Sequence, residues 1–306
     1  MEQPQTHLHQ RIESGKQLLV AELSPPKSGN PARLLAAAKR YAGKVHALGI
    51  SDNSDGACMS ALAAASLVAG QGVEPILHMV TRDRNRTALV ADYLGAQALG
   101  IGNVLCTSGT HQTLGPARQA RAVFDLDSVQ LLQTCATLAS NASVVGSKKL
   151  NGAQPLCLGA VASPFADPGE LQLLRLGKKI AAGARFLITQ PVFDVDRFKA
   201  WWQLVAERGL EKKAAILAGI RVLTSADDAE RYLARIPGAR IPPPVLKRIM
   251  SPADGKAQRA AGIALAAETI GALSKLAGLR GFEIRTSADD EEAALAVIDQ
   301  AGLKMD

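Results

Sequence analysis

The sequence of 306 residues is poor in the residue types that build several common kinds of site. Aromatic residues make up only 4% of it, and it has five histidines and four cysteines. The cysteines at positions 58, 106, 135 and 157 are far apart, with no Cys-x-x-Cys pair and no histidine pair beside them. A structural zinc site is therefore not expected, and an even cysteine count does not imply disulfides in a chain this long. We predict no metal centre.

Long hydrophobic stretches are also missing. No run approaches the ~18 apolar residues that a membrane span needs. The first sixteen residues are polar and lack the apolar core of a signal segment. The sequence thus predicts a cytoplasmic protein without a membrane partner. It also predicts a polar N-terminal tail over residues 1–16, followed by one catalytic domain over residues 17–306.

Several catalytic signatures are absent as well. The chain has no GxGxxG, no GxxxxGK[ST], no GxSxG and no HExxH. These absences disfavour a Rossmann dinucleotide site and a P-loop kinase. The apolar run at 186–192 carries no lysine, which removes one common position for a Schiff-base aldolase.

Basic residues outnumber acidic ones, 35 to 28, which gives a formal charge of +7. This balance favours anionic partners. The basic residues occur as scattered short pairs, such as Lys178-Lys179 and Lys212-Lys213, without an aromatic-rich strand beside them. That pattern is not typical of a nucleic-acid-binding surface. We expect no nucleic-acid partner and favour a small anionic substrate or cofactor.

Short apolar runs alternate with longer amphipathic segments along the whole chain, and 47% apolar residues suffice for a large core. The predicted strands are Leu18–Leu23, His46–Ser51, Pro75–Val80, Asn103–Thr107, Pro155–Val161, Phe186–Val192, Ala215–Ile220 and Gly281–Arg285. The predicted helices are Pro31–Ala42, Met59–Gly70, Arg86–Leu99, Asp127–Ser140, Glu170–Ala181, Asp194–Arg208, Ser225–Ile236, Ala257–Ala277 and Asp289–Ala301. Strand-helix alternation calls for parallel pairing through right-handed crossovers. The sequence therefore predicts an α/β fold, a single-domain (β/α)8 TIM barrel.

Polar residues gather where the predicted strands end, which is where such barrels place their reactive groups. They are Glu22, Asp52, Asn53, His78, Asp83, Ser108, Gly109, Thr110, Ser163 and Gln190.

Glu22 stands out because it interrupts an apolar strand. A carboxyl group in low-dielectric surroundings has a raised pKa, as a general acid near neutral pH needs. The alternative is an ion pair with a basic side chain at the barrel mouth, and the residues alone leave both interpretations open.

His78 and Gln190 also follow apolar strands. A neutral imidazole can bind a cofactor or brace a neighbouring loop, and the second role is the commoner one for a lone histidine. The planar amide of Gln190 carries a donor and an acceptor suited to the edge of a heterocycle, or to backbone groups of a loop.

In this order, these residues resemble the methylenetetrahydrofolate reductase family from about Leu18 to Ile284. The most specific segments are AELSPPK, PILHMV, GIGNVLCTSG and KKIAAGARFLITQPVFD. The stretches FDLDSVQLLQ and LGAVASPFADP are more similar to the divergent reductases of acetogenic and related anaerobic bacteria. The family is a (β/α)8 barrel, in agreement with the independent strand count.

The resemblance implies reduction of 5,10-methylenetetrahydrofolate to 5-methyltetrahydrofolate in one-carbon metabolism. A bound FAD or FMN would supply the hydride, with NADH or another donor as reductant, and Glu22 matches the acid that protonates folate N10. Gln190, Thr110 and Asp52 are the implied substrate contacts. The implied cofactor contacts are His78, Asn53, Ser108, Gly109, Thr110, Ser163 and Lys179. Folate tails and flavin phosphates are anions, in line with the basic composition.

The chain departs from the family at three places. Ser108-Gly109-Thr110 replaces an Arg-Gly-Asp, Ser163 replaces a tyrosine, and a C-terminal arginine of the family falls near Asp289. Neutral Thr110 makes no charge-assisted bond to a pterin, and Asp52 and Asp83 are candidates to supply the missing charge. Two alternatives follow: a flavin- or folate-binding subunit of a multi-protein reductase complex, or a folate-binding barrel without flavin. We expect a homo-oligomer or a subunit of such a complex.

Overall fold

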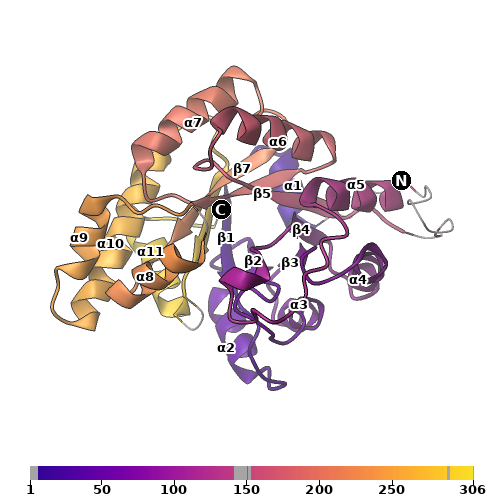
Figure 1. Cartoon of the computed structure of the whole chain (residues 1–306), viewed down its shortest axis with the longest axis horizontal. Coiled ribbons are helices and arrows are strands. Elements are labelled where there is room, and N and C mark those ends of the chain that lie inside the picture. The colour runs from indigo at the N-terminus through magenta and orange to yellow at the C-terminus, as the bar shows by residue number, and fades with distance from the viewer. Residues whose placement is uncertain (1–5, 141–149, 151–152, 237, 288–289, 306) are drawn as a thin grey trace.

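Eight parallel strands close into a barrel in chain order within the residues that the structure, a computed structural model, describes: 6–140, 150, 153–236, 238–287 and 290–305. Figure 1 shows the barrel with its helices arranged around it. The predicted (β/α)8 fold is confirmed.

The strands are β1 Leu18–Leu23, β2 Ala47–Ile50, β3 Pro75–Val80, β4 Asn103–Thr107, β5 Cys157–Ala162, β6 Phe186–Pro191, β7 Ala215–Arg221 and β8 Gly281–Arg285. The first helices are α1 His7–Glu13, α2 Ala32–Tyr41, α3 Ala61–Ala69, α4 Arg86–Ala98, α5 Ser128–Ala139 and α6 Gly169–Ala181. They are followed by α7 Val195–Glu207, α8 Ala226–Arg235, α9 Pro243–Met250, α10 Gly255–Leu273 and α11 Glu291–Gln300, and a short 3-10 helix, η1, spans Gln112–Leu114.

The strands form a barrel because nearly every residue in them is apolar and buried, so both faces need cover. Side chains alternate between two cores. In β1, Leu18 and Val20 belong to the core inside the barrel, whereas Leu19 and Ala21 pack outward under the helices. Phe186 fills the barrel interior, and it needs Gly159 beside it, because a Cβ there would lie 2.2 Å from Cζ of the ring.

Side-chain caps fix where several helices begin. Asp127 accepts hydrogen bonds from the backbone of α5 in a capping box with Gln130, and Asp194 and Ser225 accept from the first turns of α7 and α8. These caps satisfy backbone N–H groups that have no partner inside the helix. They also set the points at which the chain leaves the carboxyl ends of the strands and turns back.

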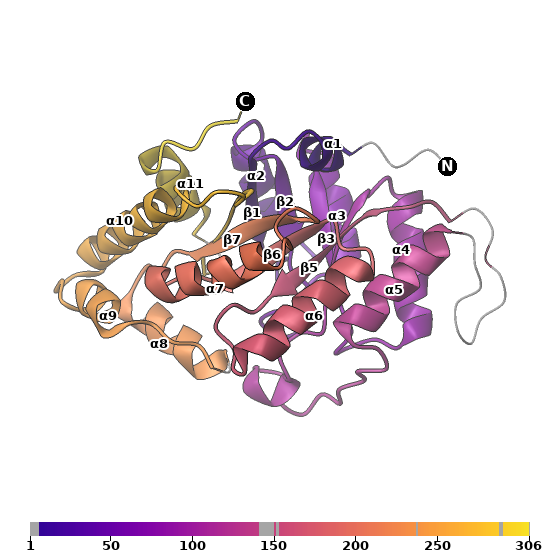
Figure 2. The same ribbon diagram turned by 90° about the horizontal axis from the view of Figure 1, so that it is seen from above.

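The structure differs from the expectation of a polar tail over residues 1–16. Within it, residues 7–13 form α1, whose Leu8 and Ile12 are buried in the core inside the barrel. Backbone N–H of Leu8 donates to Glu74 at 2.8 Å, which ties α1 to the segment before β3. Residues 1–5 lie outside the described part. Helix α1 covers the N-terminal end of the barrel, and Figure 2 shows it on the same side as both chain ends.

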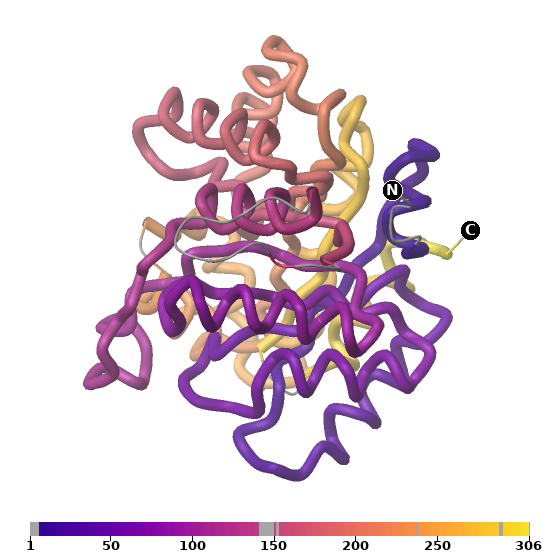
Figure 3. The backbone as a smooth tube through the Cα atoms, turned by 90° about the vertical axis from the view of Figure 1, so that its right-hand side faces the viewer, coloured from indigo at the N-terminus to yellow at the C-terminus, as the bar shows by residue number. Residues whose placement is uncertain are grey.

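The connection from β7 to β8 is the longest elaboration of the fold. It contains α8, α9 and α10, which Figure 1 shows together at one side of the barrel. Neither α9 nor η1 was expected, and Asp289, where the last helix was expected to start, lies outside the described residues. The tube in Figure 3 shows both termini on one side. No helix in the described ranges is long and apolar enough to cross a membrane.

Candidate functional site

Glu22 lies at the carboxyl end of β1, beside Gly49 of β2. It shares the inward parity of Leu18 and Val20, so its side chain belongs to the barrel interior. The side chain is 17% exposed, and its Oε2 lies 3.8 Å from Nη2 of Arg285. The position of Glu22 is compatible with both sequence-based interpretations, a general acid and an ion-paired glutamate. Its carboxyl group is largely buried, and a guanidinium faces it.

Glu283 and Arg285 complete this group from β8. Nε of Arg285 donates to Oε2 of Glu283 at 2.9 Å, and Nη2 lies at the same distance from that oxygen. Burial raises the pKa of Glu283 to about 7, while the Arg285 cation lowers it and the Glu22 carboxylate raises it. The Glu283 side chain is only 1% exposed. This pair was not predicted from the sequence. Two charged residues at alternate positions of an apolar strand do indicate a charged pair on one face of that strand.

His78 reaches the same group from β3. Burial lowers the pKa of His78 to about 4, against a smaller opposing effect of Glu22, so the imidazole is neutral at physiological pH. Its ring lies over Gly49, where a Cβ would be 2.8 Å from Nε2. That Nε2 is buried and has no hydrogen-bond partner among the described residues. We call Glu22, His78, Glu283 and Arg285 the mouth cluster.

Gln190 and Ser163 come to the same end of the barrel from β6 and β5. Gln190 has the inward parity of Ile188, is half-buried, and lies beside a register shift between β6 and β7. Ser163 follows the last residue of β5 and is also half-buried. Neither side chain hydrogen-bonds to another described residue, so both have polar capacity available to a ligand.

Asp52 is placed differently from the substrate contact that was expected. Its carboxylate accepts the backbone N–H of Val80 at 3.0 Å and pairs with Arg84. The Asp52 side chain is 3% exposed. Both of its interactions brace the connections after β2 and β3, and neither joins Asp52 to the mouth cluster.

The loop after β4 is held by a second arginine. Arg82 pairs with Asp83 and donates to the backbone oxygens of Thr110 and Asn53, each at 3.1 Å. Gly109 adopts a φ of +80°, and a Cβ there would lie 2.6 Å from Val80. This close approach explains why the middle position of Ser108-Gly109-Thr110 is glycine.

Three of the expected cofactor contacts have their polar atoms engaged. Nδ2 of Asn53 donates to Asp83 at 3.3 Å, and Oγ of Ser108 accepts the N–H of Ser128 at 3.2 Å. Nζ of Lys179 donates to the Val161 carbonyl at 2.6 Å, and burial lowers the pKa of this lysine to about 8.

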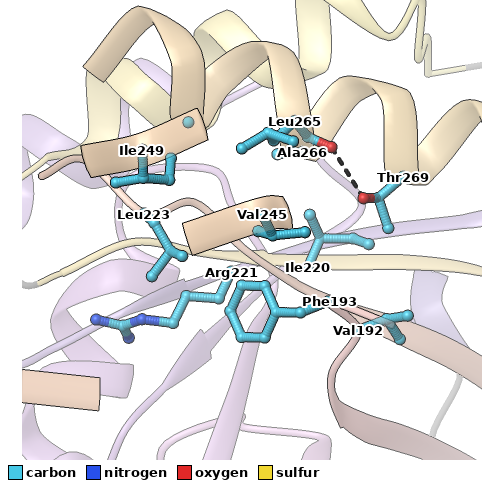
Figure 4. A pocket seen from close by; sticks show the side chains of 11 residues that line it. Val192, Phe193, Ile220, Arg221, Leu223, Val245, Ile249, Leu265, Ala266 and Thr269 are labelled. Carbon is cyan, nitrogen blue, oxygen red and sulfur yellow. Dashed lines mark hydrogen bonds between the residues drawn. The ribbon is translucent and has the colours of Figure 1, made fainter. Parts of the chain in front are cut away.

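Another buried ion pair stands at the end of β7. Nη2 of Arg221 donates to Asp228 of α8 at 2.7 Å, and its guanidinium lies 5.2 Å from the Tyr232 ring centroid. Figure 4 shows a small cavity next to it, between β7, α9 and α10, lined mainly by apolar side chains. Its volume of about 20 Å³ holds roughly one water, so it is too small for a substrate. No group of three metal-ligating side chains occurs within the described ranges.

The comparisons with known proteins agree with this architecture. A protein from Clostridium thermocellum that binds two copies of 5-methyl-5,6,7,8-tetrahydrofolic acid has a similar structure, with a TM-score of 0.67 and 16% identity over 96% of this chain and 97% of that one. An EDTA monooxygenase from Chelativorans sp. BNC1 has a TM-score of 0.55 and 13% identity, over 94% and 92% of the two chains. A 2,3-dimethylmalate lyase gives 0.53 and 13%, over 99% and 87%.

At these identities the structural likenesses show the fold alone. A search of curated proteins found no match. The family comparison is more specific, because a model of the methylenetetrahydrofolate reductase family matches residues 7–302, nearly the whole chain. The chain therefore belongs to the methylenetetrahydrofolate reductase family.

Proposed function

We propose that this protein reduces 5,10-methylenetetrahydrofolate to 5-methyltetrahydrofolate, with Glu22 as the general acid. The observation that carries the proposal is the position of Glu22: inside the barrel at its carboxyl end, mostly removed from water yet 17% exposed. Family membership supports the reaction. The folate bound by the Clostridium thermocellum protein of the same fold supports the substrate class.

Each group of the site has a task in this reaction. The proton of Glu22 passes to N10, the bond from N10 to the bridging carbon breaks, and the resulting iminium carbon at N5 accepts a hydride to become the methyl group. Arg285 holds the Glu22 carboxylate in place after the proton has left. The Gln190 amide is free to bond the polar edge of the pterin, and neutral His78 adds no positive charge to compete with the iminium cation.

The source of the hydride is a separate part of the proposal. A bound flavin would supply a two-electron hydride donor, and His78, Thr110 and Ser163 are the expected contacts that keep polar groups for it. Two other expected cofactor contacts fit less well, because Lys179 is tied to Val161 and Ser108 to Ser128. Absorbance of the fresh protein between roughly 350 and 500 nm tests for a bound flavin directly.

The same engaged residues favour a second candidate function, a folate-binding barrel that works without its own flavin or as a subunit of a reductase complex. Colourless protein that binds 5-methyltetrahydrofolate and co-purifies with partner subunits supports this candidate. Turnover by the isolated yellow protein with NADH rejects it.

The decisive experiment for the acid is Glu22→Gln. This variant keeps the shape and the hydrogen-bonding capacity of the side chain but has no proton to give. We expect folate turnover to fall at least ~100-fold, the usual range for loss of a general acid, with 5-methyltetrahydrofolate binding retained in calorimetry. Turnover is measured as methyl-folate formed with NADH or reduced viologen as donor.

The matched control is Glu13→Gln, which changes an exposed carboxylate of α1 at the opposite end of the barrel. It should leave turnover unchanged. Normal folate reduction by the Glu22→Gln protein would refute the proposed acid role.

A further inference from the structure

The mouth cluster contains two acidic groups facing one fixed cation. Arg285 bonds Glu283 at 2.9 Å and faces Glu22 at 3.8 Å. The two carboxyl groups therefore approach the same Nη2 atom of Arg285 from neighbouring strands, β1 and β8. Two carboxylates beside one cation repel each other, and a proton on one of them removes this repulsion and supplies a donor for the other.

Among the described residues around the mouth cluster, the basic groups supply no second free positive charge. From β3, His78 is neutral because it is buried. From β7, Arg221 is already paired with Asp228 at 2.7 Å. Two tyrosines also lie close enough to interact with the cluster: Tyr232 of α8 with Arg285, and Tyr41 of α2 with Glu283. Burial raises the pKa of both phenols, so both stay neutral. The Arg285 cation thus balances the charge of one carboxylate. The other carboxyl group avoids the free-energy cost of a buried unpaired charge by keeping its proton.

Exposure separates the roles of the two acids. The Glu22 side chain is 17% exposed, whereas that of Glu283 is 1% exposed. A substrate can touch the first and cannot touch the second. Glu283 also stands on β8 opposite Val20 and Gly219, in the wall between β1 and β7, where it is fixed by register on both sides.

We propose that Glu22 and Glu283 share a single proton across the mouth of the barrel, and that Glu283, fixed by Arg285, is a positioning residue that keeps this proton available to Glu22. The inference rests on the proposed function for the use of the proton. The sharing itself is a property of the protein without substrate. When Glu22 gives its proton to the substrate, the pair becomes a dianion held by Arg285, and it takes up one proton from solvent through the exposed Glu22 before the next turnover.

The first test needs no activity. Protein labelled with ¹³C at the glutamate carboxyl carbons is titrated by NMR, and the pair should give a carboxyl group that titrates near pH 7, the value to which the pKa of Glu283 is raised. Glu283→Gln should abolish this titration. Glu22→Gln should move it to lower pH, because Glu283 then has Arg285 to itself. Glu74→Gln is the matched control. Burial also raises the pKa of Glu74, but this residue contacts α1 and is not part of the mouth cluster.

The second test uses the pH profile of folate reduction. In Glu283→Gln, Glu22 alone faces Arg285 and has no second carboxyl group with which to share a proton. We expect kcat at pH 7 to fall on the order of a hundredfold and to recover as the pH is lowered towards 5, with the KM for folate little changed. A purely structural role would lower kcat equally at every pH.

Three outcomes overturn the inference. One is wild-type protein with no carboxyl group titrating above pH 6, and another is a titration that Glu22→Gln leaves unmoved. The third is a Glu283→Gln profile parallel to that of the wild type. Should Glu283→Gln fail to fold, the Glu22→Gln titration decides the question alone. A titrating pair in a protein that never reduces folate would retain the shared proton and reject the proposed function.

Discussion

Gly49 is the position where a single added methyl group should have the clearest effect on the mouth cluster. A Cβ at this residue of β2 would lie 2.8 Å from Nε2 and 3.4 Å from Cε1 of His78. Ordinary contact distances are about 3.5–4.0 Å, so the imidazole must move in Gly49→Ala. The ring is only 7% exposed, so its neighbours must move with it.

The expected magnitude combines two opposing terms. Overpacking of a buried site costs about 1–3 kcal/mol. Replacing glycine by alanine lowers the entropy of the unfolded chain and returns about 0.4–1 kcal/mol. We therefore expect Gly49→Ala to lower the free energy of unfolding by about 1–2 kcal/mol. Urea unfolding followed by circular dichroism measures this change.

A double-mutant cycle isolates the contact from other effects. In a His78→Ala background the ring is gone, so Gly49→Ala should be neutral or stabilising. Gly271→Ala serves as a control, because a Cβ at this position of α10 meets nothing within 4 Å. It should stabilise the helix by about 0.5–1 kcal/mol. Equal destabilisation by Gly49→Ala with and without His78 would refute the reasoning.

Two further predictions concern buried charge. Asp228→Asn should lower the free energy of unfolding by about 3–5 kcal/mol, because it leaves Arg221 buried without its counter-ion; the exposed neighbour Asp227→Asn is the control in the same urea assay, and similar stability of the two variants would contradict the prediction. The unfolded chain protonates its histidines near pH 6.5, whereas burial lowers the pKa of His78 to about 4. The unfolded state therefore binds more protons between these values, and the stability of the wild type should fall as pH drops from 6.5 to 4, with His78 responsible for up to about 3 kcal/mol. His78→Gln should show a shallower fall, and unchanged steepness would rule this contribution out.

The barrel was readable from the sequence because its strands are short apolar runs that end in polar turns. Four of the strands begin and end at the residues expected, among them β1 and β8. Helix α1 was missed because its two buried apolar side chains, Leu8 and Ile12, are too few to give a polar segment a recognisable helical pattern. Their burial depends on packing against the barrel core, which the local sequence does not show. Helix α9 was missed because it starts within a run of prolines, which is typical of a loop.

The site was readable only in part. Glu22 was conspicuous because a single acid interrupts an apolar strand, and the structure places it at the carboxyl end of the barrel. Sequence spacing carries no information on long-range pairing, so the engagement of Asp52 by Arg84 could not be foreseen. For the same reason Glu283 and Arg285 were read as strand residues. They lie 261 and 263 positions after Glu22, and the pairing of β8 with β1 that closes the barrel brings them beside it.

Helix α1 has a consequence for the order in which ligands come and go. Leu8 and Ile12 fill the N-terminal end of the barrel interior, whereas Glu22 keeps its exposed fraction at the carboxyl end. In the proposed reaction, a folate seated against Glu22 would therefore enter and leave on the carboxyl side, so that the product departs before the next substrate binds.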